Sequence, residues 1–269
     1  MSRSPFELVS LDLDGTLLDA GLRVSPRNLA AVRRCRSLGA RVVISSGRMH
    51  DSTLVYWRAM ALDTPIISYN GAFIKHEETG EVLLDEHLDA MVARELVALC
   101  EERGLHLNYY CDDRLYIARP NHWGDLYAAR TSSLPHPVGN LRALEGKPPT
   151  KLLIVADAAR VASLLAELGP RYAGRAYVTT SFPEYLEFMP LSVDKGKALA
   201  VVARRFGIAR ERVVAFGDAM NDVPAIRWAG LGVAMENAIA EARAAADRIA
   251  PHHAEDGVAV VLEDLFGAQ

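Results

Sequence analysis

The feature that most constrains this chain is an apolar run near its start that ends abruptly in charge. Residues 8–11 read Leu-Val-Ser-Leu, and the carboxylates Asp12 and Asp14 follow, just before Gly15. We expect a buried strand over residues 7–13, in which alternating side chains place both carboxylates on one face. Gly15 allows a sharp turn where the strand ends. Open α/β sheets place their chemistry at such strand ends.

Strand-like and helix-like segments alternate in both end regions of the chain, and this rhythm predicts an α/β fold with a parallel sheet. Ser25 followed by Pro26 is typical of a helix start, and Gly39 is typical of a helix end. We expect strands at residues 7–13, 41–46, 65–69, 212–216 and 231–234. We expect helices at residues 26–38, 50–61 and 193–206, a further helix that starts near residue 221, and two more helices after residue 234.

The middle of the chain has a different texture and is expected to form a separate α+β module. Hairpins and helices replace the parallel-sheet rhythm between about residues 84 and 188. The expected domains are therefore a core of residues 1–83 and 189–269, with an insertion of residues 84–188. Within the insertion we expect a helix at 89–103, a hairpin of 106–111 and 114–118, a loop at 131–150, a strand at 151–156, a helix at 158–168 and two short strands within 175–188.

Composition excludes several classes of function. The net charge is −4 and no basic stripe is present, so nucleic acid is not an expected partner. No apolar stretch reaches the length that a membrane span needs, and residues 1–7 contain no apolar signal region. The three cysteines are scattered and suggest buried thiols, neither a zinc site nor a disulfide framework. We therefore expect a cytoplasmic protein, monomeric or homodimeric, with a small-molecule substrate and no membrane partner.

Polar residues follow several of the expected strands and form the candidate site. Asp12 and Asp14 follow the first strand, and Ser46 and Gly47 end the second. Lys195 begins the helix after the insertion. Because parallel strands end at the same edge of a sheet, all these groups are expected to converge. The fourth group follows the strand at 212–216 and consists of Gly217, Asp218, Asn221 and Asp222.

This set of residues supports a phosphoryl-transfer reaction. Asp12 is the candidate nucleophile, which attacks phosphorus and forms an aspartyl-phosphate. Asp14 is the candidate acid–base group, which protonates the leaving oxygen and later deprotonates the attacking water. Lys195 supplies positive charge near the phosphoryl oxygens.

An all-oxygen set of donors suits Mg²⁺, which is the expected cofactor. Asp12, the backbone carbonyl of Asp14, and Asp218 are the candidate ligands. Asp222 is expected to orient the metal shell, and Asn221 to orient the metal shell and the phosphate. The Ser46 hydroxyl and the nearby backbone N–H groups, beginning at Gly47, are candidate phosphate-binding groups.

These motifs resemble those of the haloacid dehalogenase-like phosphohydrolase superfamily, specifically its Cof-type (class IIB) branch. The resemblance spans almost the whole chain and implies a Rossmann-like core, an inserted α+β cap, Mg²⁺ and aspartyl-phosphate chemistry. It rests on Asp12-Leu-Asp14-Gly15-Thr16, Ser46-Gly47-Arg48, Asn70-Gly71-Ala72, Lys195-Gly196, Gly217-Asp218-Ala-Met-Asn221-Asp222, Ala234-Met235-Glu236-Asn237-Ala238 and Glu255-Asp256-Gly257-Val258.

Four positions depart from the family's pattern. One of them, Pro224, lies two residues after Asp222 and is acceptable in the first turn of a helix. Ser46 stands where threonine is commoner, a change that keeps the hydroxyl group. Asp194 precedes the lysine of the Lys195-Gly196 motif, and Glu236 replaces a frequent glycine. None of the four removes a catalytic group, and both acidic residues are expected to alter the charge near the site.

Other residues have simpler structural interpretations. Asn70 is expected to favour a left-handed turn, and Arg48 to pair with a core carboxylate. His252 and His253 form an expected surface pair without a metal. One stretch of the insertion is interpreted as a surface hairpin with a packed aromatic residue, in preference to a substrate-binding site; it contains Arg114, Tyr116, Arg119, His122 and Trp123. Glu187 and Met189, in contrast, are candidates to face a substrate cleft.

The sequence therefore predicts a Mg²⁺-dependent phosphatase for a small phosphorylated metabolite, in particular a sugar phosphate. A phosphosugar mutase-like phosphotransferase is an alternative, distinguished by an isomeric product in place of free phosphate. A catalytically silent metabolite-binding regulator is a second alternative, against which the presence of Asp12, Asp14, Lys195 and Asp218 argues. Dehalogenation is disfavoured because Asp14 is suited to handle protons on an oxygen leaving group.

Overall fold

The computed structural model describes residues 5–131 and 133–267 of the 269-residue chain. The chain divides into two compact units, one of Met1–Leu84 with Asp194–Gln269 and one of Asp85–Val193. We call them the core unit and the inserted unit. No described helix is both long and apolar enough to cross a bilayer.

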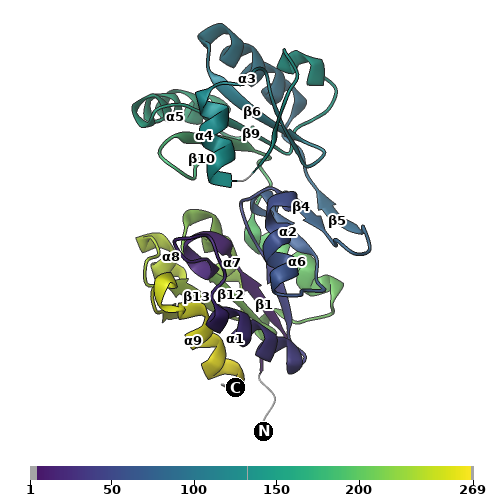
Figure 1. The fold of residues 1–269 in the computed structure, drawn as a ribbon, viewed down its shortest axis with the longest axis vertical. Helices are drawn as coiled ribbons and strands as arrows, with labels where there is room; N and C mark the ends of the chain where they lie inside the picture. Colours follow the sequence, from purple (N-terminus) through teal and green to yellow (C-terminus); the bar gives the residue numbers. More distant parts are fainter. Residues whose placement is uncertain (1–4, 132, 268–269) are drawn as a thin grey trace. The chain divides into compact units, whose positions relative to one another are not determined.

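The core unit is built on a five-stranded sheet in which every pairing is parallel, in the order β14-β13-β12-β1-β2 (Figure 1). The last residue of β1, Leu11, lies opposite Phe216 of β12 and Ile44 of β2. The carboxyl ends of these three strands are therefore level, and the loops that follow them start from one edge. The strands are β1 Leu8–Leu11, β2 Arg41–Ile44, β12 Val213–Gly217, β13 Leu231–Met235 and β14 Arg248–Ala250.

Helices cover both faces of this sheet, because every central strand is apolar on both sides. α1, α2 and α9 pack with Val9, Leu11 and their neighbours on one face, whereas α6 and α7 pack with Leu8 and its neighbours on the other. The helices are α1 Pro26–Ser37, α2 His50–Ala59, α6 Lys195–Arg205, α7 Val223–Trp228, α8 Ala240–Ala245 and α9 Gly257–Phe266.

A small second sheet in the order β3-β4-β5 completes the core unit. Its strands are β3 Ile66–Ser68, β4 Phe73–Lys75 and β5 Val82–Asp85. A single bridge between Ser45 and Ile67 links β3 to the end of β2. Between β3 and β4, Asn70 adopts φ 57° and ψ 22°, the left-handed turn that the sequence predicts.

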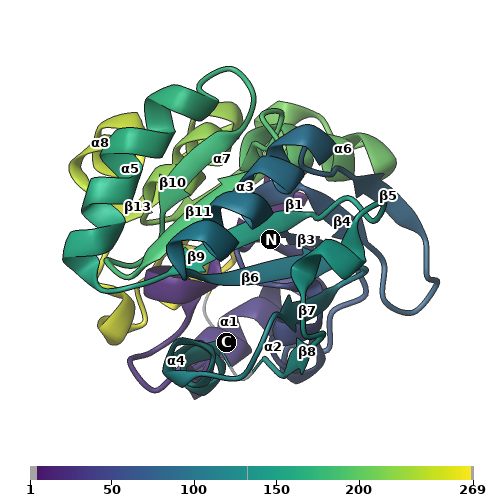
Figure 2. The ribbon, with the colours of Figure 1, turned by 90° about the horizontal axis from the view of Figure 1, so that it is seen from above.

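The inserted unit is a six-stranded sheet in the order β10-β11-β9-β6-β7-β8 (Figure 2). Its strands are β6 His106–Cys111, β7 Arg114–Ile117, β8 Pro135–Pro137, β9 Lys151–Val155, β10 Tyr177–Thr180 and β11 Tyr185–Met189. α3 Ala90–Arg103 and α5 Ala158–Tyr172 pack on the face that carries Leu107 and Tyr109. α4 His122–Thr131 contacts Tyr110, which alternation places on the opposite face.

The expected α/β class is confirmed, and several element ends follow the chemistry that the sequence indicates. The Ser25 hydroxyl accepts a hydrogen bond from the N–H of Asn28 and caps α1. Gly104 ends α3 in the left-handed conformation, at φ 61°. Asp112 and Asp113, both with positive φ, form the tight turn of the hairpin between β6 and β7.

Four expectations about elements are wrong. β1 ends at Leu11, and the next residues, Leu13–Leu17, form a wide helical turn instead of further strand. α4 lies where the sequence pattern predicts a surface hairpin, and β8 lies where it predicts a loop. β14 lies within a segment where only helices are expected. These segments are short or weakly amphipathic, so contacts with the rest of their unit stabilise them, not their own periodicity.

Candidate active site

The loop after β1 separates the two carboxylates that the sequence places on one strand face. Asp12 follows the strand directly, is buried, and donates its backbone N–H to the carbonyl of Phe216 on β12. Asp14 lies in the helical turn, and its side chain is 45% exposed. The same-face expectation is wrong because the strand ends at Leu11, before its alternation reaches either residue.

Asp12 lies close to two carboxylates from the loop after β12. Asp12, Asp218 and Asp222 each offer an oxygen, and these three oxygens lie within 4.8 Å of one another. Gly15, with φ +76°, makes this approach possible: a Cβ atom there would lie 2.4 Å from Oδ2 of Asp218. The glycine of the Asp12–Thr16 motif thus provides space for a carboxylate more than 200 residues away.

Asp222 is fixed by its own loop. Its Oδ2 accepts hydrogen bonds of 3.0 Å from the backbone N–H groups of Asp218 and Ala219. The hydroxyl of Thr16 donates to Oδ1 of Asp218 at 3.1 Å. These hydrogen bonds fix the orientation of the Asp218 and Asp222 carboxylates beside Asp12.

Lys195 is the cation at the centre of this cluster. Its side chain is 1% exposed, and Nζ donates to Oδ1 of Asp12 at 2.8 Å and to Oδ1 of Asp222 at 2.6 Å. It is the first residue of α6, and Asp194 caps the helix by accepting from the N–H groups of Gly196 and Lys197. Asp194, one of the departures from the family's pattern, therefore fixes the helix start.

The cluster carries more negative than positive charge. Burial, with repulsion from Asp222, raises the pKa of Asp12 well above its usual value, although Lys195 acts in the opposite direction. Burial and Asp222 also raise the pKa of Asp218, to about 6. For Lys195, burial alone would lower the pKa, but Asp12 and Asp222 outweigh it and the net shift is upward. Three carboxylates against one ammonium leave an excess of two negative charges.

A divalent cation fits this cluster. Its donors are carboxylate oxygens, which Mg²⁺ prefers, and its charge would neutralise the excess. Both oxygens of Asp222 are already engaged, one by Lys195 and one by backbone N–H groups. Asp12 and Asp218 are therefore the carboxylates with oxygens available to a cation.

The remaining candidate residues form a second group around the Asn70 turn. Asn221 donates its side-chain amide to Oδ1 of Asn70 at 2.7 Å. Gly47 lies against the same atom, since a Cβ atom there would be 2.7 Å from it. The hydroxyl of Ser46 is buried and accepts a 3.2 Å hydrogen bond from the N–H of Arg48. The turn therefore links the loop after β2 to the loop after β12.

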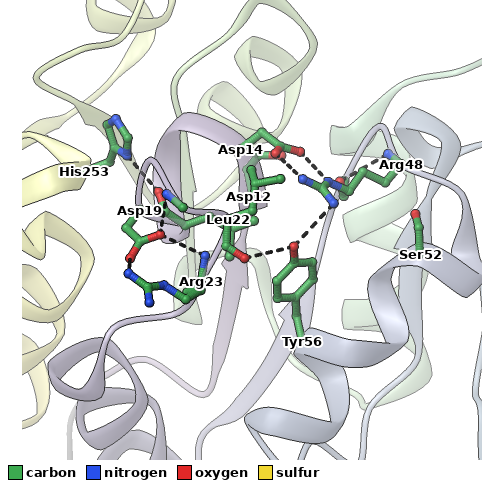
Figure 3. A network of polar contacts seen from close by, with 12 residues as sticks. Asp12, Asp14, Asp19, Leu22, Arg23, Arg48, Ser52, Tyr56 and His253 are labelled. Atoms are coloured by element: carbon green, nitrogen blue, oxygen red, sulfur yellow. Dashed lines mark hydrogen bonds and ion pairs between the residues drawn. The ribbon is translucent and has the colours of Figure 1, made fainter. Parts of the chain in front are cut away.

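Arg48 pairs with a carboxylate, as expected, and that carboxylate is Asp14 (Figure 3). Its Nε donates to Oδ2 at 2.7 Å and its second terminal nitrogen donates to Oδ1 at 2.5 Å. Each of the two aspartates of the first motif thus has its own cation: Lys195 for Asp12 and Arg48 for Asp14.

Two residues without an assigned role hold the loop that follows β1. Asn237 donates its side-chain amide to the carbonyl of Gly15 at 2.7 Å and accepts from the N–H of His253. The ring of His253 bonds the carbonyl of Leu18 at 2.7 Å (Figure 3). The expected pairing of His252 with His253 is present, with ring centroids 4.7 Å apart, but both residues are half-buried. Asn237 was marked by its motif, whereas no local pattern marked His253.

We expect Asp218→Asn to stabilise the metal-free protein. Because the folded-state pKa of about 6 exceeds the ordinary value of 3.8, the stability that Asp218 contributes is full below 3.8 and is lost as pH rises through 6. The asparagine retains an acceptor for Thr16 but carries no charge. In EDTA at pH 7.5 the variant should gain about 3 kcal/mol in urea unfolding, and near pH 4 most of the gain should vanish. A gain that is equal at both pH values would contradict the electrostatic explanation.

Comparisons with known proteins identify the family. The family model of the haloacid dehalogenase-like hydrolases matches residues 9–262. A Bacillus subtilis protein named 5-amino-6-(5-phospho-D-ribitylamino)uracil phosphatase YitU is 32% identical, over 99% of both chains.

Two solved structures have the same fold over nearly their whole length. A haloacid dehalogenase-like hydrolase from Bacteroides thetaiotaomicron aligns with a TM-score of 0.89 at 31% identity, covering 97% of this chain and 99% of that one. TM0651 from Thermotoga maritima aligns with a TM-score of 0.88 at 35% identity, covering 96% and 97%. The family match spans both units and every motif on which the resemblance rests, so the chain belongs to the haloacid dehalogenase-like hydrolases, as a phosphatase of the Cof type.

Proposed function

We propose that this protein is a Mg²⁺-dependent phosphatase that hydrolyses a small phosphorylated metabolite through an aspartyl-phosphate on Asp12. One observation carries the proposal: a buried carboxylate, Asp12, lies between an ammonium group and a second carboxylate at the end of a central strand. The named activity of the Bacillus subtilis relative, a phosphatase, supports the reaction type.

Lys195 holds the carboxylate of Asp12 in place. Among the described residues, the only side chain that donates to the Asp12 carboxylate is Lys195, and it binds Oδ1. We assign the attack on phosphorus to an oxygen of this carboxylate. In this step the bond between that oxygen and phosphorus forms and the bond from phosphorus to the substrate oxygen breaks. The ammonium of Lys195 stays within reach of the phosphoryl oxygens and offsets the charge that develops on them.

Asp14 is proposed to move the protons. It donates one to the departing substrate oxygen, and it then takes one from the water that attacks the aspartyl-phosphate. That water releases inorganic phosphate and returns Asp12 to its carboxylate form. The exposed position of Asp14 suits this role, because a half-exposed group can reach both substrate and solvent.

The cation would be held by the side chains of Asp12 and Asp218 and the backbone carbonyl of Asp14. Bound there, Mg²⁺ supplies positive charge that reduces repulsion between the phosphate and the carboxylates. Asp222 orients the site through its bonds to Lys195 and to the backbone of Asp218.

The phosphate is proposed to bind between two loops. The Ser46 hydroxyl and the N–H of Gly47 come from the loop after β2. Asn221 comes from the loop after β12, and one of its two amide N–H donors is used by Asn70, which leaves the other for the ligand. Lys195 completes the set.

The substrate is proposed to carry its phosphate on a sugar or sugar-alcohol chain. The name of the Bacillus subtilis relative describes such a group, a phosphorylated ribityl chain. Residues 84–188 are proposed as the cap domain that selects the substrate. The three cysteines are all free and buried, which suits the reducing cytoplasm.

The test is a panel of phosphorylated metabolites assayed for released phosphate in ¹⁸O-labelled water, with and without Mg²⁺. We expect one ¹⁸O atom in the phosphate, because water attacks the phosphorus of the intermediate. EDTA should lower the rate at least 100-fold and added Mg²⁺ should restore it. Full activity in EDTA would contradict the metal proposal. An isomeric sugar phosphate without free phosphate would indicate a mutase, and tight ligand binding without turnover would indicate a regulator.

A further inference from the structure

The contact between Asp14 and Arg48 has a geometry that a simple surface ion pair lacks. Two separate nitrogens of the guanidinium each meet one oxygen of the carboxylate, at 2.7 and 2.5 Å. Such a two-bond contact fixes both the position and the plane of the carboxylate. The Arg48 side chain is only 16% exposed, whereas that of Asp14 is 45% exposed. The arginine is therefore the more buried partner and the aspartate the more exposed one.

Arg48 is itself held from a second side. Its remaining terminal nitrogen donates to the hydroxyl of Tyr56 on α2 at 3.4 Å, and its guanidinium carbon lies 5.4 Å from the centre of that ring. The Tyr56 hydroxyl donates in turn to the carbonyl of Leu22 at 3.2 Å (Figure 3). These contacts link the loops after β1 and β2 to α2.

Asp14 needs such an anchor because nothing else on its own segment orients it. It lies in a turn with non-helical dihedral angles, φ −78° and ψ 122°. Among the described residues, Arg48 is the only one whose side chain bonds the Asp14 carboxylate. An acid–base group works only when it lies within hydrogen-bond distance of the reacting oxygen.

We propose that Arg48 is the positioning residue for Asp14 and that Tyr56 fixes Arg48 in that role. This inference rests on the proposed function of Asp14 as the group that protonates the leaving oxygen. Each carboxylate oxygen accepts one bond from Arg48 and keeps a second lone pair, to which a proton can bind while Arg48 holds the group in place.

The experiment compares two substrates with different needs for a proton. Nitrophenolate leaves p-nitrophenyl phosphate as a stable anion, whereas the alkoxide of glycerol 3-phosphate requires protonation as it departs. We compare kcat/KM, which covers steps only up to departure of the alcohol and excludes hydrolysis of the aspartyl-phosphate. The readout is the ratio of kcat/KM for glycerol 3-phosphate to that for p-nitrophenyl phosphate. Loss of overall fold lowers both values and leaves this ratio unchanged.

We expect Arg48→Gln to lower the ratio at least 10-fold, and Asp14→Asn to lower it by the same factor or more. In the double variant the ratio should equal that of Asp14→Asn alone, because both changes act on one group. Arg48→Lys should recover only part of the loss, since an ammonium lacks the planar two-bond geometry. The matched control is Arg58→Gln, an exposed arginine of the same helix as Tyr56, which should leave the ratio unchanged.

The outcomes separate the inference from the function on which it rests. If Asp14→Asn lowers the ratio and Arg48→Gln does not, the positioning role is wrong and the acid–base role of Asp14 stands. If Asp14→Asn leaves the ratio unchanged, the acid–base role itself is wrong. An equal loss on both substrates in Arg48→Gln, together with a lower melting temperature, assigns Arg48 a structural role and overturns the inference.

Discussion

Replacing Asp12 by asparagine is expected to abolish turnover in a chain that remains folded. The asparagine Oδ1 still accepts the hydrogen bond from Lys195, and an amide NH₂ group takes the place of the second oxygen; neither atom of this uncharged amide attacks phosphorus. Loss of a covalent nucleophile in other enzymes costs on the order of 10⁴-fold or more in kcat. We expect a loss of that size, measured as phosphate release from the substrate found in the panel.

Folding should survive this change because it removes one of three crowded carboxylates. Asp12 is buried with a raised pKa, so its charge is unfavourable in the metal-free protein. The melting temperature in EDTA should therefore be equal to or higher than that of the unchanged chain. Glu241→Gln, which removes an exposed carboxylate from α8, is the control and should retain full activity. Activity of Asp12→Asn above about one hundredth of the starting value would refute the nucleophile assignment.

Replacing Lys195 by methionine should cause the largest loss of stability. Methionine fills a similar volume but leaves the buried carboxylates of Asp12 and Asp222 without their ammonium. Removing one partner of a buried ion pair typically costs about 3–5 kcal/mol, because the remaining charge is neither paired nor hydrated. We expect a loss of this size in the free energy of unfolding at pH 7.5, measured with urea in EDTA, together with loss of turnover.

Two controls isolate the electrostatic cause. Lys197→Met lies two residues along the same helix, where the lysine is exposed, and should cost less than about 1 kcal/mol. Asp222→Asn combined with Lys195→Met should recover part of the lost stability by removing one of the unpaired carboxylates. If Lys195→Met lost no more stability than Lys197→Met, Lys195 would not be the counter-charge of this cluster.

Much of the fold follows from short-range signals in the sequence. Ser25, Gly104 and the Asp112-Asp113 turn end or cap their elements because each meets a local backbone requirement. The buried central strands are apolar on both faces, and that pattern indicates a parallel sheet without reference to any partner. The confirmed family assignment has the same origin, since each of its motifs is a run of adjacent residues.

Other features could not be predicted from the sequence, because they depend on contacts between residues that are distant in the chain. α4 has a local cap, since Asn121 accepts from the N–H groups of Trp123 and Gly124, but the cap alone did not predict the helix. The helix packs through Tyr127 against Tyr110 and Tyr185. His253 bonds the carbonyl of Leu18, 235 positions away in the chain. No local pattern specifies such partners.

The sequence by itself determined the class of fold, the family and the chemical types gathered at the strand ends. The tertiary structure decided how those groups are paired. Asp12 and Asp14 are two positions apart, yet one is buried against Lys195 and the other half-exposed against Arg48. The physical reason is that β1 ends at Leu11: beyond it the chain turns, and the positions of the loops after β2 and β12 and of α6 determine which charge each carboxylate meets.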